Sequence, residues 1–153
     1  MQSTIVATEP FLILDVEVGA PVEIGGAGAG GRRCIPITGG RVSGTLRGAI
    51  LPGGADWQMV HPDGSLQIDA HYAFRTDDGA VVEVRSNGVR TGPADVLKRM
   101  LAGDSVDPRQ YYFRTSIRMH TGAEALSHLN FRLAVARGER QRHSVHLEVF
   151  EVL

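Results

Sequence analysis

Hydrophobic and polar residues alternate along most of this chain, as they do in β-strands that bury one face. The clearest segment is 65–76, in which one face carries Leu66, Ile68, Ala70, Tyr72 and Phe74. Segments 11–18 and 111–120 alternate in the same way. Each of these three segments is therefore predicted to form a strand with one apolar face.

Turn signals divide the rest of the chain into further strands. Asp78-Gly79 is expected to close a hairpin after 65–76, because Asp-Gly readily adopts the positive φ angles of tight turns. Asn87-Gly88 is expected to end the returning strand at 88. Pro36 cannot donate a ladder hydrogen bond, so its strand is expected to be edge-like or bulged. The glycine-rich segment 25–31 is expected to be a loop, and the other predicted strands are 32–38, 39–51, 80–88, 130–136 and 143–153.

One segment has helical rather than strand periodicity. In 92–103, Pro93 stands near the first helical position, Gly103 follows the end, and Val96, Leu97, Met100 and Leu101 form an apolar stripe. This helix is expected to lie against the sheet or to plug one end of it. A short helical turn is also predicted at 122–129.

The count of seven to nine strands with short connections predicts an antiparallel sheet that can close on itself. The fold class is therefore all-β with one short helix, a closed up-and-down barrel of about eight strands. The 153 residues suit a single β-barrel domain, 1–153. Apolar residues on mixed strand faces, such as Phe11, Ile13 and Phe150, lead us to expect a homodimer.

Composition and charge limit the kinds of partner that this chain is expected to have. Cys34 is the only cysteine, which excludes an internal disulfide and a cysteine-based metal cluster. The formal net charge of −1, with both signs scattered, argues against nucleic acid, and the arginine-rich segment 137–143 is interpreted as a solvated hairpin loop. No signal peptide is expected, and no apolar run approaches the ~20 residues of a membrane helix. We therefore expect a cytoplasmic protein with no membrane partner.

Asp56 and Trp57 are the first candidates for a site. They lie between the turn signals at 52–54 and 62–64, an unusual place for the chain's one tryptophan. A carboxylate beside an indole at the rim of a barrel could be a general base with a raised pKa. The alternative is structural: Trp57 caps the core and Asp56 binds turn amides.

Other candidates are Tyr72, Arg114 and His120. A buried Tyr72 needs a hydrogen-bond partner and could be an acid or an oxyanion donor. Arg114 stands among aromatic residues and could bind a carboxylate or phenolate, or form an ion pair on the outer face. His120 could transfer protons near neutral pH. The histidines have no metal-binding spacing, so neither a metal nor a cofactor is expected.

Several motifs resemble a bacterial and fungal family, the domain of unknown function three-two-three-seven, also called uncharacterised protein family three-eleven. They are Gly-Gly-Ala-Asp-Trp (53–57), Thr-Asp-Asp-Gly (76–79), Tyr-Phe-Arg (112–114) and Leu-Asn (129–130), and the resemblance extends from about Phe11 to Val152. It implies a roughly eight-stranded antiparallel barrel similar to lipocalin or allene-oxide-cyclase barrels, with no established function.

The resemblance also marks site residues and two departures. Its motifs strengthen the candidacy of Asp56, Trp57 and Arg114 and add Tyr112, His128 and Asn130 as substrate-binding candidates. The family pattern has Phe-Glu-Thr where this chain has Met119-His120-Thr121, and an aromatic residue where it has His128. These departures imply that the chemistry of this chain differs from that of its relatives.

Three functions are compatible with these residues. The first is a cofactor-independent enzyme, a lyase or isomerase, that acts on a small apolar or aromatic oxygenated molecule by proton transfer leading to elimination, isomerisation or cyclisation. Asp56 or His120 would move the proton, and Arg114 and Tyr72 would stabilise the anion. The second is a non-catalytic small-molecule-binding barrel. The third is a structural or interaction protein with a filled barrel, so an open lumen would favour the first two.

Overall fold

The structure is a computed structural model that describes residues 3–26 and 30–153, so part of the predicted loop 25–31 lies outside the described residues. The strands are β1 (Leu12–Val18), β2 (Val22–Gly25), β3 (Gly31–Gly44), β4 (Gly48–Ile50), β5 (Gly54–Val60), β6 (Leu66–Thr76), β7 (Val81–Thr91), β8 (Tyr112–Thr121), β9 (Leu133–Arg140) and β10 (Ser144–Glu151). The helices are α1 (Ala94–Leu101) and two 3₁₀ segments, η1 (Pro108–Gln110) and η2 (Glu124–Phe131). The predicted helix at 92–103 is thereby confirmed.

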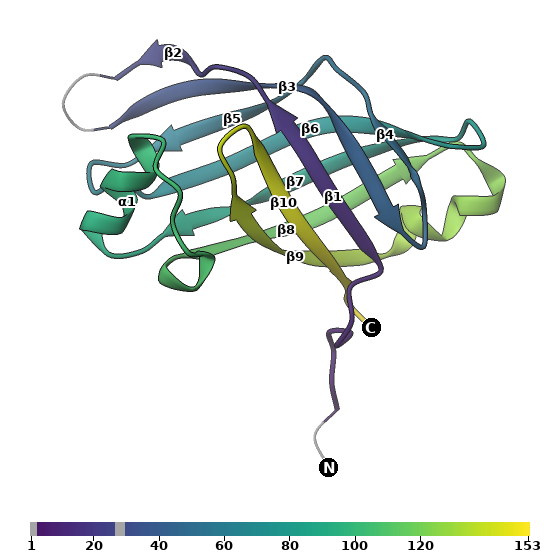
Figure 1. The fold of residues 1–153 in the computed structure, drawn as a ribbon. Helices are drawn as coiled ribbons and strands as arrows, with labels where there is room; N and C mark the ends of the chain where they lie inside the picture. Colours follow the sequence, from purple (N-terminus) through teal and green to yellow (C-terminus); the bar gives the residue numbers. More distant parts are fainter. Residues whose placement is uncertain (1–2, 27–29) are drawn as a thin grey trace.

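The strands form a closed antiparallel barrel of eight strands, which confirms the predicted fold class. Closure follows from β1, which pairs with β10 on one side and with β3 on the other. β4 and β5 occupy successive parts of one position between β3 and β6, and β2 extends the β3 side. Figure 1 shows the strands curling around a common axis, with the two termini leaving from the same side.

β3 differs from the prediction of two separate strands at 32–38 and 39–51. It is one strand of 14 residues that pairs with β5 in its first half and with β1 in its second half. The change of partner occurs at Gly39 and Gly40, and Gly40 has a φ of +138°. A Cβ at Gly40 would lie 2.1 Å from the carbonyl oxygen of Asp15, so only glycine lets the two strands approach at this bend.

β7 also differs from the prediction, because it does not end at Asn87-Gly88. It continues to Thr91 and pairs with β6 and β8 along its whole length. Gly88 lies inside the strand, where a Cβ would come within 2.0 Å of the carbonyl oxygen of Arg114. The glycine therefore permits close strand packing rather than a turn, and the extra residues bring Arg90 to the end of the strand.

The two ends of the barrel are different. α1 lies over one end and η2 over the other, the light-green coil at the right of Figure 1. Toward η2 the interior is filled with apolar side chains that have almost no exposed surface, among them Leu12, Leu14, Phe74, Val82 and Val149. In the part of the chain that the structure describes, no helix has the length and apolar character needed to cross a membrane.

Candidate functional site

The half of the barrel toward α1 contains two adjoining cavities. The inner cavity has a volume of about 40 Å³ and is mostly apolar. The outer one, the mouth pocket, has a volume of about 250 Å³ and lies between the strand ends and the last turn of α1. Both are lined by Val18, Asp56, Ile68, Phe113 and Val145, so the inner cavity continues the mouth pocket toward the centre of the barrel.

Asp56 stands where the two cavities meet. It lies in β5 rather than in a turn, opposite Ala70 of β6, and its side chain shares the inner face of the strand with Gln58. One carboxylate oxygen accepts a hydrogen bond of 2.7 Å from the Gln58 amide, and the other accepts one of 3.0 Å from the backbone N–H of Asp69. Gln58 in turn accepts a 2.7 Å hydrogen bond from Nε of Arg33, which holds the carboxylate in a fixed orientation.

The environment of Asp56 disfavours its charge. Burial raises the pKa of the Asp56 carboxyl above its usual range, although the hydrogen bonds from Gln58 and Asp69 and the charge of Arg33 oppose this effect. A carboxyl group with a raised pKa can exchange protons closer to neutral pH than a solvated one. The site therefore has a group suited to acid–base chemistry.

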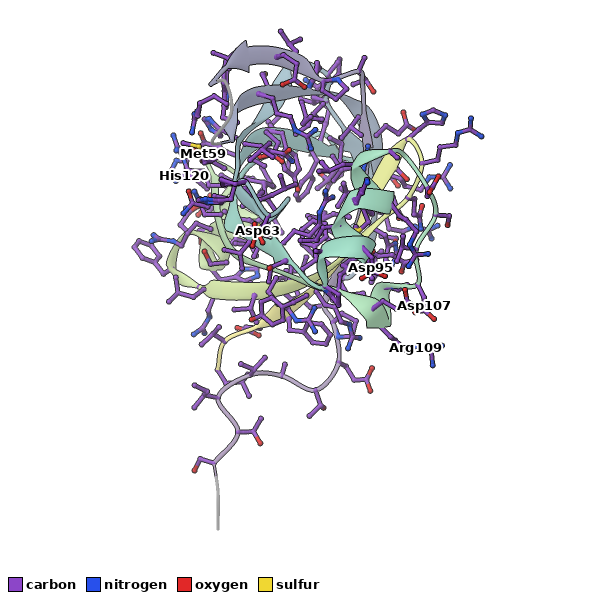
Figure 2. All side chains as sticks on the ribbon, turned by 90° about the vertical axis from the view of Figure 1, so that its left-hand side faces the viewer. Met59, Asp63, Asp95, Asp107, Arg109 and His120 are labelled. Carbon is purple, nitrogen blue, oxygen red and sulfur yellow. The ribbon has the colours of Figure 1, made fainter. Side chains whose placement is uncertain are left out.

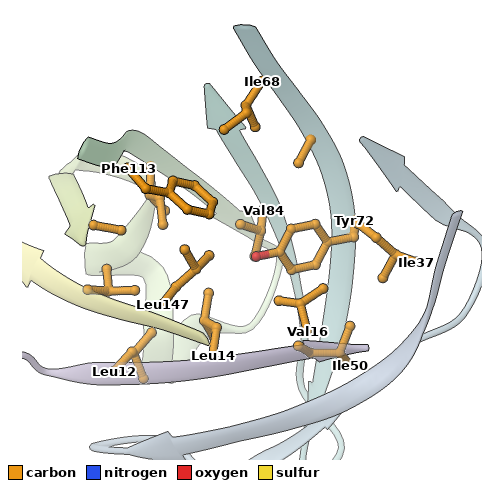
Figure 3. Close-up of a cluster of buried hydrophobic side chains, with 14 of the residues drawn as sticks. Leu12, Leu14, Val16, Ile37, Ile50, Ile68, Tyr72, Val84, Phe113 and Leu147 are labelled. Atoms are coloured by element: carbon orange, nitrogen blue, oxygen red, sulfur yellow. The ribbon is translucent and has the colours of Figure 1, made fainter. Parts of the chain in front are cut away.

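Tyr72 projects from β6 into the inner cavity. Figure 3 shows its hydroxyl group among the apolar side chains of the barrel interior. Among the described residues, the buried hydroxyl has no hydrogen-bond partner, and neither has the buried Oγ1 atom of Thr115 on the cavity wall. Burial, with the nearby charge of Asp56, raises the pKa of Tyr72, so the phenol stays protonated and available as a donor.

Three arginines line the mouth pocket from three different strands. They are Arg33 of β3, Arg90 of β7 and Arg140 of β9. Arg90 is only 5% exposed, and its buried Nε atom has no hydrogen-bond partner in the part of the chain that the structure describes. Burial, together with the charges of Arg33 and Arg140, lowers the pKa of Arg90 to about 10. All three side chains stay charged at neutral pH and give the pocket an excess of positive charge.

Of the residues predicted from the sequence, the structure brings Asp56 and Tyr72 to the same cavity. Their chemical roles stay predictions. Trp57 follows Asp56 in β5, so it points to the outer face and is 45% exposed. Asn130 binds the backbone N–H and C=O of Thr121 at the η2 end, and His128 is exposed there. These last three residues lie away from the cavities.

The side chains of β8 point alternately into the barrel and to its outer surface. Phe113 and Thr115 face the lumen, so Tyr112, Arg114 and His120 face outward. Arg114 packs over the Tyr112 ring, with its guanidinium carbon 5.0 Å from the ring centre, and Figure 2 shows His120 at the outer edge of the barrel. Arg114 therefore borders neither of the cavities that Asp56 lines, because strand alternation directs it to the outer face, which was the alternative given for it from the sequence.

The arginines were missed by the sequence analysis, although a signal existed for two of them. Arg33 has the same parity as the buried Ile35 and Ile37 in β3. Arg90 lies on the same face of β7 as the buried Val82 and Val84, and the sequence indicates this once the strand is extended beyond Gly88. Arg140 belongs to β9, not to the solvated loop that was predicted at 137–143.

The pocket offers donors rather than metal ligands. Within residues 3–26 and 30–153, no three His, Cys, Asp or Glu side chains gather closely enough to hold a metal ion. The guanidinium groups and the Gln58 amide supply hydrogen-bond donors, and Asp56 is the one carboxylate among the residues that line the mouth pocket. This arrangement is suited to binding an oxygen-rich anionic or polarised group.

The fold and the site define a closed β-barrel with a polar mouth and a small apolar cavity. The sequence profile of the family described as protein of unknown function (DUF3237) matches residues 6–152, and the chain belongs to this family. Among the relatives, a UPF0311 protein of Bradyrhizobium diazoefficiens is 39% identical over 146 residues, covering 95% of this chain and 96% of the relative. A UPF0311 protein of Clostridium acetobutylicum is 36% identical, covering 94% and 92%.

Solved structures have the same fold. A conserved protein of unknown function from Rhodopseudomonas palustris superposes with a TM-score of 0.92 at 38% identity, covering 100% of both chains. A β-barrel-like protein from Acinetobacter baumannii gives 0.82 at 37% identity, covering 98% of both chains. An enzyme from Penicillium herquei gives 0.73 at 18% identity, covering 100% of this chain and 98% of its own. At that identity the last similarity concerns the fold alone.

Proposed function

We propose that the barrel binds a small apolar or aromatic oxygenated molecule at its α1 end and converts it by acid–base proton transfer without a cofactor. The observation that carries this proposal is the position of Asp56. Its carboxylate borders both the polar mouth pocket and the apolar inner cavity. A molecule that fills both spaces would have its reacting carbon or oxygen beside this group.

The surrounding residues supply what such a reaction needs. Asp56 takes or returns the proton, and the positively charged mouth stabilises the enolate or phenolate that forms. Tyr72 can donate a hydrogen bond to a ligand oxygen in the inner cavity, because its hydroxyl has no partner among the described residues. Elimination, isomerisation and cyclisation all begin with this kind of proton transfer, so the activity is that of a lyase or an isomerase.

A second candidate is a binding protein without catalytic activity, and one observation favours it. Both oxygens of the Asp56 carboxylate already accept hydrogen bonds, from Gln58 and from the backbone of Asp69. Each bond lowers the basicity of the group and holds it in place. In this alternative, Asp56 orients Gln58 and Arg33 toward a ligand that leaves unchanged.

The elimination of 5-nitrobenzisoxazole distinguishes these candidates. A carboxylate takes the proton from carbon 3, the C–H electron pair completes a nitrile, and the N–O bond breaks to leave a coloured phenolate. The probe is small, aromatic and oxygenated, and its reaction needs no cofactor. We expect the protein to accelerate this reaction beyond an equal concentration of acetate, and Asp56→Asn to remove at least 90% of the acceleration, within the range usual for general-base catalysis.

Asp95→Asn is the matched control, because Asp95 is an exposed aspartate of α1 at the same end of the barrel. This variant should keep the wild-type rate. Binding of the probe is measured separately by shifts in the NMR signals of the methyl groups of Ile68 and Val145. If the probe binds at these residues and its conversion is unchanged by Asp56→Asn, the catalytic proposal is refuted and the binding protein is favoured.

A further inference from the structure

We propose that Arg33, Arg90 and Arg140 form an oxyanion site, so that the ligand of this barrel is an apolar or aromatic molecule with a carboxylate or phosphate group. The anionic group would occupy the mouth pocket, and the apolar body would extend into the inner cavity. The proposal rests on the proposed function and specifies the class of molecule on which it acts.

The convergence of the three arginines is built into the strands. Each arginine lies on the inward face of its strand. On that face Arg140 follows Ala136 and Gly138 in β9, Arg90 follows Val84 and Ser86 in β7, and Arg33 precedes Ile35 in β3. These strands are separated from one another in the barrel, so the side chains enter the pocket from different sides. An anion in the pocket would be surrounded rather than touched from one side.

Each arginine has unused hydrogen-bond donors. A guanidinium group carries five N–H donors. Arg33 uses Nε for Gln58, and Arg140 uses one terminal nitrogen for the carbonyl oxygen of Ser144 at 3.1 Å. The Nε of Arg90 is buried with no partner at all among the described residues. A buried, unpaired, charged donor is costly, and an oxyanion in the pocket would satisfy it.

The protein supplies too little negative charge for these arginines. Among the described residues, no carboxylate lies within 4 Å of a guanidinium nitrogen of Arg33, Arg90 or Arg140. Asp56 lines the same pocket, and the negative charge of Glu23 in β2 attracts Arg33. Neither carboxylate forms an ion pair with Arg90. The arginines repel one another in a partly desolvated site, and a bound oxyanion would replace that repulsion by attraction.

The apolar part of the ligand follows from the walls of the pocket. Met100 and Leu101 of α1 cover the mouth, and Ile68, Phe113 and Val145 lead from it to the inner cavity. A free inorganic anion would leave this apolar surface uncovered. The geometry therefore points to an amphiphilic molecule whose charged group stays near the mouth.

Three naphthalenes of similar shape test this inference: 2-naphthoate, 2-naphthyl phosphate and the neutral 2-naphthamide. Calorimetry at neutral pH should show that at least one anion binds ten times more tightly than the amide, and the ratio of the two anions identifies the preferred oxyanion. Arg90→Gln should weaken binding of that anion by about 10- to 100-fold, as expected for a lost charge-assisted hydrogen bond. Binding of 2-naphthamide should change by less than about threefold.

The controls separate this inference from the catalytic proposal. Arg85→Gln removes an arginine from the outer face of the same strand and should leave all three affinities unchanged. Arg33→Gln and Arg140→Gln should also weaken anion binding. Because these positions are less buried, the two variants serve as the test if Arg90→Gln does not fold. Asp56→Asn should keep or tighten anion binding while it removes proton transfer. Equal binding of amide and anions, or equal loss of all three in the arginine variants, would overturn the oxyanion site.

Discussion

Replacing Arg90 by methionine is expected to stabilise the unliganded protein. Arg90 is 5% exposed, and its Nε has no hydrogen-bond partner within residues 3–26 and 30–153, so the folded chain gains little from its charge. A methionine keeps most of the apolar stem that packs at the barrel mouth and removes the charged group. The expected result is therefore a more stable protein that has lost its affinity for anions.

The magnitude follows from the pKa of Arg90. Burial and two neighbouring arginines lower this pKa to about 10, which is ~2.5 below the ordinary value for an arginine. Each pKa unit corresponds to ~1.4 kcal/mol, so the charge costs the folded state ~3 kcal/mol. Imperfect packing of the new side chain offsets ~1 kcal/mol. We expect a net gain of ~2 kcal/mol, which raises the Tm of a domain of this size by ~4–8 °C.

The sign of this effect is fixed by the direction of the pKa change. A cation whose pKa is lowered by folding destabilises the folded state at every pH at which it is protonated. The cost is present in full below pH ~10 and disappears only as the pH rises toward the value of the unfolded chain. At neutral pH the whole difference between wild type and Arg90→Met should therefore be visible.

Urea unfolding followed by circular dichroism measures the difference, with Arg85→Met as the control on the outer face of β7. The control should stay within ~0.5 kcal/mol of wild type. If Arg90→Met lowers the free energy of unfolding instead, Arg90 stabilises the fold through contacts of its own, and the reasoning from its unpaired charge is refuted. Addition of the preferred naphthalene anion should stabilise the wild type and not the variant.

Two further predictions concern the cavity walls. Tyr72→Phe should raise the free energy of unfolding by ~1 kcal/mol, because it removes a buried hydroxyl that has no partner among the described residues. Tyr111→Phe should instead lower it by ~1 kcal/mol, because the Tyr111 hydroxyl accepts a 2.9 Å hydrogen bond from the backbone N–H of Arg140. Equal losses for the two variants in urea titrations would contradict this. Because folding raises the pKa of Asp56, its contribution to stability is present in full below the unfolded value near ~3.9 and is lost as the pH rises through the folded value. The stability of wild type relative to Asp56→Asn should thus fall as the pH rises above ~4, and a difference that stays constant from acid to neutral pH in urea titrations would contradict the raised pKa of Asp56.

Much of the barrel could be predicted from the sequence because its longest strands have one wholly apolar face. In β6, five consecutive inward positions are apolar, and a strong turn follows. β5 could not be recognised in the same way. Its inward positions include Asp56 and Gln58, while Trp57 and Met59 face outward, which is the reverse of the usual pattern. The polar lining of the mouth therefore concealed the strand that carries the central residue of the site.

The site itself was predicted only in part for a related physical reason. Alternation divides a strand into two faces, but it does not say which charged residue lines a polar lumen and which lies on the outer surface. In β8 the apolar face is the inner one, so Arg114 lies outside. In β7 the inner face changes from valine to Ser86 and then to Arg90 as it reaches the mouth. The two arginines lie at neighbouring levels along the barrel axis, because Arg90 pairs with Phe113 and Arg114 with Val89. The face of the strand separates them, and that face could be assigned to Arg90 only by extending β7 past Gly88.

The gradient along that axis bears on whether the barrel is merely a structural element. At the η2 end the interior is packed with leucine, valine and phenylalanine, as a barrel that serves only for stability would be throughout. At the α1 end the same strands present Arg90, Tyr72 and Thr115, each with a buried polar atom that has no partner among the residues that the structure describes. Each such atom costs ~1–3 kcal/mol of stability that an apolar residue would not. A sequence that can pack one half of the barrel so well has no structural reason to accept this cost in the other half, and a ligand that pairs with these groups supplies one.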